Sequence, residues 1–252
     1  GKTSFSVQLG HEFAHQGYKT LLIDNDPSGD ATAAIFGQDI PETITNGSRP
    51  EAVANTVWLY HESGVAEPVE VHENLFAMGA TDALTMLRGA DMEPAYTFCE
   101  SVDILGEGYD VVIIDCPPSF GLLFTAAILA TRNSGVLIPA LPDELAFKAA
   151  CKVDERITQM NRVMGANVSI LGELMNRVVT NPLPQSARYY LDEFDSRFGS
   201  QMLSTHVHQT VKMSDALALQ DSLRNYAKGH KVVGQIESVT KEIVDRLGDL
   251  QQ

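Results

Sequence analysis

Four residues at the beginning of the chain, Gly1, Lys2, Thr3 and Ser4, have types and spacing that suit phosphate chemistry, and they run directly into an amphipathic stretch. They match the end of the pattern G-x-x-x-x-G-K-[ST]. In that pattern glycines let backbone N–H groups curl around phosphates, the lysine neutralises the β and γ phosphates, and the hydroxyl after it ligates Mg²⁺. We therefore expect these four residues to contact the phosphates of a nucleotide, with Thr3 also a magnesium ligand. Because G-K-T also occurs at ordinary helix starts, this interpretation depends on the motifs that follow.

Aspartates follow two apolar runs further along the chain. Asp24 and Asp26 come after the run at 19–23, a spacing that lets both carboxylates emerge at the carboxyl end of a strand, where parallel sheets bind ligands. Asp115 ends a second run, and the prolines that soon follow cannot continue a strand. An apolar strand ending in aspartate is typical of strands that hold magnesium through water. Each aspartate alone fits a turn or a helix N-cap equally well, but three elements in this order favour a nucleotide site.

The elements that position these residues alternate along the chain, apolar runs of strand length with longer amphipathic stretches. We expect strands over 19–24, 74–78, 110–115, 135–139, 168–176 and 205–207. We expect helices over 3–16, 50–62, 94–105, 120–131, 145–164, 186–198 and 234–247, with Gly17 and Gly165 as C-caps. Strand and helix in repetition predict an α/β fold, a doubly wound, mostly parallel sheet with helices on both faces.

Length and composition favour one domain. The 252 residues suffice for a large α/β core, and no linker rich in Pro, Gly or Ser divides them. No apolar run approaches the ~18 residues of a membrane span and no signal-peptide pattern opens the chain, so the expected location is the cytoplasm. The three cysteines are far apart and are expected to be small buried residues rather than metal ligands.

Charge is distributed unevenly along the chain. The net charge of -15 argues, taken whole, against a polyanionic partner. Residues 1–140 hold 5 basic and 19 acidic side chains, however, whereas 141–252 hold 13 basic and 14 acidic ones. Any surface for nucleic acid is therefore expected in the second half.

The phosphate and aspartate motifs together resemble those of the ParA/MinD class of deviant Walker A ATPases, whose phosphate loop reads K-G-G-x-G-K-[ST]. The resemblance covers essentially the whole chain. The matching segments are 1–4, then 24–32 (D-x-D-P followed by G-x-A-T), 73–84, 115–118 (D-x-P-P) and, more loosely, 139–144, 176–177 and 205–216.

This resemblance implies a magnesium-dependent ATPase, with ATP and Mg²⁺ as its cofactors. It implies that Lys2 and Asp26 are catalytic, Asp26 by positioning the attacking water, that Asp115 belongs to the magnesium shell, and that Asn176 faces adenine. The signature lysine of the class and a first strand would precede Gly1, so we expect a chain that lacks its first strand and the first half of the phosphate loop.

Within the class, the sequence is more similar to ParA/Soj-type partition ATPases than to the membrane branch. The helix expected over 234–247 has a net acidic polar face, which anionic lipid would repel. The resemblance implies a homodimer in the ATP state, nonspecific DNA and a ParB-like centromere-binding protein as partners, no membrane, and association with the nucleoid when ATP is bound. Candidate DNA contacts are the basic residues of the second half, Arg188, Lys212, Arg224, Lys228 and Lys231, although scattered cations on helices are usually a solvated face.

Other functions of the same scaffold stay open at this point. They are a ParA-like positioning ATPase with a protein cargo, a MinD-like membrane-associated ATPase, a small-molecule ligase, and a reductase or iron–sulfur carrier. The last needs paired cysteines, and Cys116, after the second aspartate, has no neighbouring cysteine in sequence.

Overall fold

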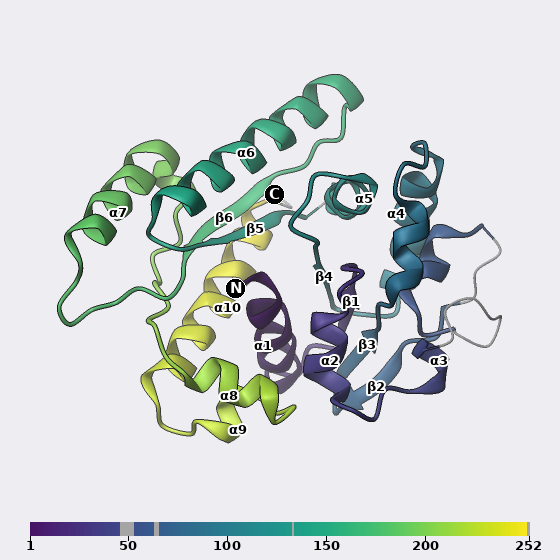
Figure 1. Cartoon of the computed structure of the whole chain (residues 1–252), viewed down its shortest axis with the longest axis horizontal. Coiled ribbons are helices and arrows are strands. Elements are labelled where there is room, and N and C mark those ends of the chain that lie inside the picture. The colour runs from purple at the N-terminus through teal and green to yellow at the C-terminus, as the bar shows by residue number, and fades with distance from the viewer. Residues whose placement is uncertain (46–52, 63–65, 133, 251–252) are drawn as a thin grey trace. The chain divides into compact units, whose positions relative to one another are not determined.

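The computed structural model describes residues 1–45, 53–62, 66–132 and 134–250. These residues form two compact units, coloured along the chain in Figure 1. The N-terminal unit comprises Lys2–Ala130 and Ser214–Tyr226. The C-terminal unit comprises Thr131–Met213 and Ala227–Gln252, together with Gly1. Each unit has its own sheet and core, and the single domain expected from the sequence stays a prediction.

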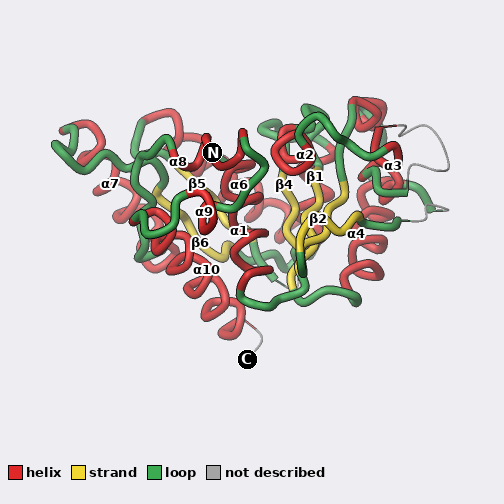
Figure 2. Tube along the Cα trace, turned by 90° about the horizontal axis from the view of Figure 1, so that it is seen from below, coloured by secondary structure: helices red, strands yellow, loops and turns green. Residues whose placement is uncertain are grey.

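The N-terminal unit contains a four-stranded sheet of order β2-β3-β1-β4. Its strands are β1 (Thr20–Asp24), β2 (Val69–His72), β3 (Leu75–Met78) and β4 (Val111–Asp115), and Figure 2 shows the labelled β1, β2 and β4 beside one another. β1 is parallel to both β3 and β4, while β2 is an antiparallel edge strand. The register places Asp24 opposite Asp115, so two aspartates meet at the carboxyl edge of this sheet.

Both faces of this sheet are covered, as the sequence predicted. Successive side chains of a strand point to opposite faces. Accordingly, Leu21 and Ile23 pack into a core with α4 (Glu93–Gly106) and α5 (Leu122–Ala130), and Leu22 packs into a second core. The second core is built with α1 (Lys2–His15), α2 (Asp30–Phe36) and α8 (Lys212–Ala218). The doubly wound arrangement is therefore confirmed for this unit.

The C-terminal unit is built on two parallel strands, β5 (Val136–Ala140) and β6 (Ile170–Met175). Its helices are α6 (Glu144–Met164), α7 (Gln185–Phe198) and α10 (Lys231–Leu250). α6 begins at an N-cap, Asp143, whose side chain accepts a hydrogen bond from the Ala146 N–H at 2.8 Å, and ends at Gly165, a left-handed C-cap with φ 63°. Aromatic side chains of α6 and α7 pack against the strands.

Three expected elements differ from the structure. Residues 205–207 form no strand. Val207 makes backbone hydrogen bonds with Met175 and Val178, and the neighbouring His208 forms an isolated bridge with Val178, but these contacts do not extend into a ladder. The described part of the helix expected over 50–62 is a 3₁₀ helix, η1 (Thr56–Tyr60); residues 46–52 lie outside the described residues. The last helix begins three residues before the predicted 234. Short elements that the sequence analysis did not identify are α2, β2, α8, α3 (Glu42–Thr45), α9 (Leu223–Tyr226) and the 3₁₀ helices η2 (Asp82–Leu87) and η3 (Gly199–Gln201).

The last helix packs as a core helix. Its apolar stripe, formed by Ile236, Val239 and Ile243, is buried, whereas Leu250 at its end is exposed. Among the described residues, no helix is both long and apolar enough to cross a membrane.

Candidate active site

The first turn of α1 carries the phosphate-binding candidates Lys2 and Thr3. The first N–H groups of a helix have no intrahelical partner, and the helix dipole makes this end positive, so it suits an anion. One turn further on, the Ser6 hydroxyl donates a hydrogen bond to Asp115 Oδ1 at 2.8 Å. This bond ties the beginning of α1 to the carboxyl end of β4, which brings the predicted phosphate and magnesium residues into one site.

Asp115 is buried with one carboxylate oxygen unsatisfied. It is 1% exposed, and its Oδ2 accepts no hydrogen bond from any described residue. Burial raises the pKa of Asp115, while the hydroxyls of Ser6 and Thr3 and the ammonium of Lys2 oppose that shift. A buried carboxylate oxygen without a donor is costly unless a cation or an ordered water satisfies it. The residues present therefore fit a magnesium ion with its water shell.

Asp24 serves a different purpose from Asp115, because its side chain bonds to the loop that follows β1 and to α2, the helix after that loop. Its Oδ2 accepts from the Thr32 N–H at 2.8 Å and the Thr32 hydroxyl at 2.7 Å, and its Oδ1 accepts from the Asp26 N–H at 3.1 Å. Burial raises the pKa of Asp24 to about 6, and these hydrogen bonds oppose the rise. The carboxylate thus fixes the loop that carries Asp26.

Asp26 itself stays accessible. Its side chain is half-buried, and Oδ1 accepts only the nearby Ser28 N–H at 3.0 Å. It lines a cleft of about 710 Å³ together with residues of the segments 27–30, 85–89 and 117–123. An accessible carboxylate on a fixed loop can hold a water molecule, which is the role that the family resemblance implies for Asp26; that role stays a prediction.

Two polar residues that the sequence analysis overlooked join this loop to its surroundings. The buried Asn25 donates from Nδ2 to the Leu123 carbonyl at 3.0 Å and accepts the Tyr60 hydroxyl at 2.7 Å. The Thr32 hydroxyl also accepts the Ala80 N–H at 2.8 Å. Asn25 lies between two aspartates in sequence, but nothing in the sequence indicates its partners, which are 35 and 98 residues away.

The remaining predicted nucleotide residues are placed as follows. Gly1 is exposed and precedes α1, and Ser4 is half-buried in the first turn. Asn176 follows β6 in the C-terminal unit and is 5% exposed. Its Oδ1 accepts the Arg177 N–H at 2.7 Å, so part of the amide is already used by the backbone. Contact between Asn176 and adenine stays a prediction.

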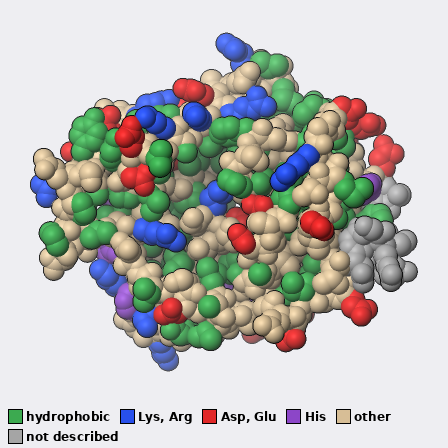
Figure 3. Space-filling model, in the orientation of Figure 1, with side chains coloured by type: hydrophobic (Ala, Val, Ile, Leu, Met, Phe, Trp, Pro, Cys, Tyr) green, Lys and Arg blue, Asp and Glu red, His purple; other side chains and the backbone are tan. Residues whose placement is uncertain are grey.

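The candidate DNA contacts fall into two groups. Arg188 of α7, Lys228, and Lys231 at the beginning of α10 are exposed, and Lys212 at the beginning of α8 is half-buried. Arg224 is different, because its Nη2 contacts Glu12 Oε1 at 2.7 Å, and a phosphate contact there would have to break this pair. On the face drawn in Figure 3, Lys and Arg side chains occur singly or in small groups, with acidic side chains between them.

Comparison with known proteins places the chain among ATPases of related architecture. Residues 1–170 match the family described as AAA domain. The sporulation initiation inhibitor protein Soj of Bacillus subtilis is 26% identical over 226 residues, which cover 86% of this chain and 82% of that protein. The chromosome-partitioning ATPase Soj of Treponema pallidum is 24% identical over 250 residues, covering 98% of this chain and 94% of that protein.

Solved structures agree on the fold. A Cyanothece McdA variant in complex with ATP superposes with a TM-score of 0.81 at 20% identity, covering 98% of this chain and 92% of that one. Cobyrinic acid a,c-diamide synthase from Mycobacterium smegmatis with bound ADP and magnesium has a TM-score of 0.69 at 22% identity, covering 91% of both chains. At these identities the similarity establishes a mixed α/β fold with a mostly parallel sheet flanked by helices.

Proposed function

Because the chain belongs to the AAA domain family and, within it, to the ParA/MinD class of ATPases, we propose that it is an ATP-dependent molecular switch of the ParA type. Magnesium-dependent hydrolysis of ATP would control its dimerisation and its nonspecific binding to DNA during the partition of a plasmid or chromosome. The observation that carries the proposal is the meeting of the Lys2–Thr3 helix start with Asp115, whose buried Oδ2 has no partner among the described residues.

Each residue of the site has a role in this proposal. Backbone N–H groups at the beginning of α1 and the Lys2 ammonium hold the β and γ phosphates, and Gly1 and Ser4 form part of the same cradle. Thr3 and Asp115 hold magnesium, Asp115 through water. A bound magnesium ion supplies charge neutralisation at the phosphate oxygens.

Asp26 orients the attacking water. Because this role concerns the transition state, it contributes to the rate of hydrolysis and little to the binding of ATP. Asp24 and Thr32 fix the loop on which Asp26 stands, and Asn25 links that loop to the segment after β4. A loop held at several points limits the freedom of the water that Asp26 positions.

The proposed partners follow from the ParA type. They are a second copy of the chain in the ATP state, nonspecific DNA, and a ParB-like centromere-binding protein, with association to the nucleoid when ATP is bound. The burial of the apolar stripe of α10 in the core supports the ParA type over the MinD type, because a membrane-binding helix would offer that stripe to lipid.

For DNA we propose contacts by Arg188, Lys212, Lys228 and Lys231, all of which lie in the C-terminal unit. Their charges would meet the phosphate backbone, and such contacts carry no sequence information. Affinity should then be independent of DNA sequence, and its logarithm should fall with the logarithm of salt concentration by about 0.9 per phosphate neutralised.

The test is a salt titration of DNA binding with ATP and with ADP in the full-length protein. The variant K228E/K231E should bind DNA more weakly than wild type and with a shallower salt dependence, because two phosphate contacts are removed. K19E, an exposed lysine of the N-terminal unit, is the matched control and should bind as wild type does. Equal affinity of the wild type in both nucleotide states would reject the DNA switch and favour the second candidate, a ParA-like ATPase that positions a protein cargo.

A further inference from the structure

One segment of the chain leaves the C-terminal unit and returns to it. Ser214–Tyr226 belongs to the N-terminal unit, although Lys212 precedes it and Lys228 and Lys231 follow it in the C-terminal unit. We call Ser214–Tyr226 the docked segment. Its two ends lie within two residues of proposed DNA contacts, so any displacement of the segment reaches them through the backbone.

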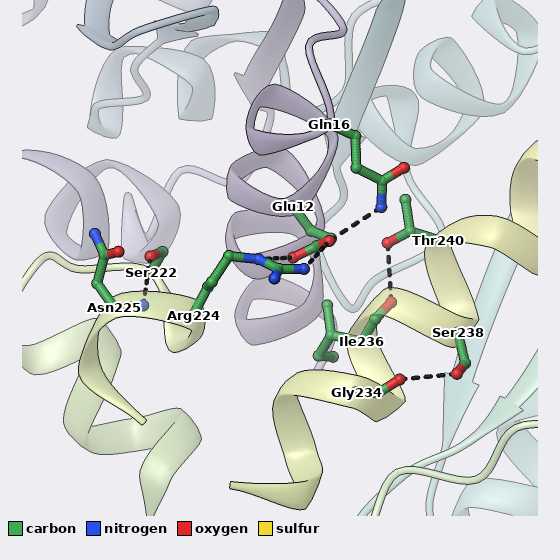
Figure 4. Close-up of polar contacts among 9 residues, drawn as sticks. All are labelled: Glu12, Gln16, Ser222, Arg224, Asn225, Gly234, Ile236, Ser238 and Thr240. Carbon is green, nitrogen blue, oxygen red and sulfur yellow. Dashed lines mark hydrogen bonds and ion pairs between the residues drawn. The ribbon is translucent and has the colours of Figure 1, made fainter. Parts of the chain in front are cut away.

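The docked segment is held on the phosphate-binding helix α1 by buried polar groups. Gln8 of α1, 2% exposed, donates to the Asp221 carbonyl at 3.1 Å and accepts the Leu223 N–H at 2.7 Å. Glu12, 4% exposed, pairs with Arg224 through two contacts, 2.7 Å to Nη2 and 3.2 Å to Nε. Figure 4 shows Arg224 reaching across to Glu12, with Gln16 donating to the same carboxylate.

The same segment also touches α2, the helix that follows the Asp26 loop. Leu217 packs on a core cluster that contains Val7 of α1 and Ala31 of α2. At the end of α2, Gln220 lies so close to Gly37 that a Cβ there would come within 2.8 Å of the Gln220 amide. The segment therefore rests on the two helices whose first turns border the nucleotide site.

The Glu12–Arg224 pair contributes more to the register of the docked segment on α1 than to the stability of the fold. Glu12 is buried, whereas the Arg224 side chain is 29% exposed. Taking the carboxylate and part of the guanidinium out of water costs free energy that the ion pair repays only in part, and replacement of such a pair by apolar side chains is often neutral or stabilising. What a two-pronged pair adds is direction, because two parallel N–H···O bonds from the planar guanidinium restrict its orientation relative to the carboxylate. One register of the docked segment on α1 is thereby selected.

We propose that the docked segment couples the nucleotide state of α1 and α2 to DNA affinity, with Glu12 and Arg224 as positioning residues that fix its register. This inference rests on the proposed DNA switch. It assigns Arg224 a partner within the chain instead of a DNA phosphate. Movement of the first turns of α1 and α2 on nucleotide binding would shift the segment and, through its ends, Lys212 and Lys228.

The test compares wild type with E12M/R224M, in which both charges are replaced by apolar side chains of similar length. R224M alone leaves Glu12 buried without its guanidinium partner and should lower the melting temperature, whereas the double variant should regain it. In the double variant the ratio of DNA affinity with ATP to that with ADP should fall toward one. The expected loss is about 5- to 150-fold, the usual strength of coupling between two sites.

Controls and a second readout separate the possible outcomes. E144M/K148M removes an exposed ion pair of α6 and should keep the wild-type ratio. Hydrogen exchange of the amides of Ser214–Tyr226, measured with ATP and with ADP, should differ between nucleotides in wild type and not in E12M/R224M. If this difference is present but wild type binds no DNA, the docked segment responds to nucleotide, but its proposed coupling to DNA affinity falls together with the DNA function. An unchanged ATP-to-ADP ratio of DNA affinity in a folded E12M/R224M would overturn the coupling. So would a loss of DNA affinity in both nucleotide states together with a salt slope reduced by about one, because that result would indicate a direct phosphate contact by Arg224.

Discussion

Replacement of Glu173 by methionine should stabilise the protein, and the gain should increase with pH. Glu173 lies in the middle of β6, is 0% exposed, and neither of its carboxylate oxygens has a hydrogen-bond partner among the described residues. Burial raises its pKa from 4.5 to about 8; the charge of Asp154 adds to the shift and that of Arg197 opposes it. Methionine has a similar length and no group that needs a partner.

The magnitude follows from the two pKa values. Below pH 4.5 the carboxyl is protonated in both states, so its ionisation contributes no penalty to folding. As pH rises toward 8, the unfolded chain releases this proton and the folded chain keeps it, so folding stability falls at up to about 1.4 kcal/mol per pH unit. With a pKa of about 8 in the folded state, the cost for Glu173 is about 0.8 kcal/mol at pH 5 and about 3.3 kcal/mol at pH 7.

Urea unfolding of wild type and E173M at pH 5 and pH 7 measures this difference. The advantage of E173M should grow by about 2.5 kcal/mol between the two pH values, because every other titrating group is common to both proteins. E100M replaces an exposed glutamate of α4 and should change stability by less than about 0.5 kcal/mol at either pH. The same advantage of E173M at both pH values would refute a proton held by Glu173.

Three further substitutions test the nucleotide site of the full-length protein. K2A should abolish nucleotide binding, because the charge facing the β and γ phosphates is lost, whereas the exposed K19A should bind as wild type does; calorimetry with ATP decides, and retained affinity in K2A contradicts the phosphate assignment. D26A should bind ATP normally and lose about 100-fold or more in turnover, with the exposed D39A unaffected; turnover within a few-fold of wild type would show that Asp26 is misassigned. T32V leaves a buried carboxylate without one of its donors and should lower the free energy of unfolding by about 1–3 kcal/mol, whereas an unchanged value would mean that the hydroxyl contributes nothing to the loop.

Much of the fold could be predicted from sequence, because five strands and six helices each appear in the sequence as an uninterrupted apolar or amphipathic run. Every position of β1 is buried, and the apolar run that such a parallel strand requires is visible in the sequence just before Asp24. The edge strand β2 was missed although Val69 and Val71 alternate with polar residues, since four residues are too few to separate a strand from a loop. Asn74, with φ 63°, turns the chain between β2 and β3, which the sequence alone did not reveal.

The site could be predicted only in part. Lys2, Thr3 and Asp115 stand in motifs whose order predicts a nucleotide site, and the Ser6–Asp115 bond joins the helix of the first two residues to the strand of the third. Arg224 could not be distinguished from a solvated cation, because Glu12, the residue that pairs with it, lies 212 residues away in sequence. Pairing between polar side chains that are far apart in sequence produces no periodic pattern in the sequence. Counting charges in each half of the chain therefore detects the basic stretch but does not show which of its cations pair with a carboxylate of the same chain.

Helix α1 is the element at which the two polar networks of the N-terminal unit meet. Ser6 reaches Asp115 at the nucleotide site, and Gln8 and Glu12 reach the docked segment. At about 100° per residue, Ser6 and Gln8 point some 200° apart, to opposite sides of the helix, whereas Gln8 and Glu12 lie about 40° apart on one side. A helix with intact backbone hydrogen bonds moves as a rigid rod, so a displacement sensed on the Ser6 side appears on the Glu12 side. The proposed coupling of bound phosphate to the docked segment therefore needs no separate conformational relay, because α1 presents one face to Asp115 and the other to the docked segment.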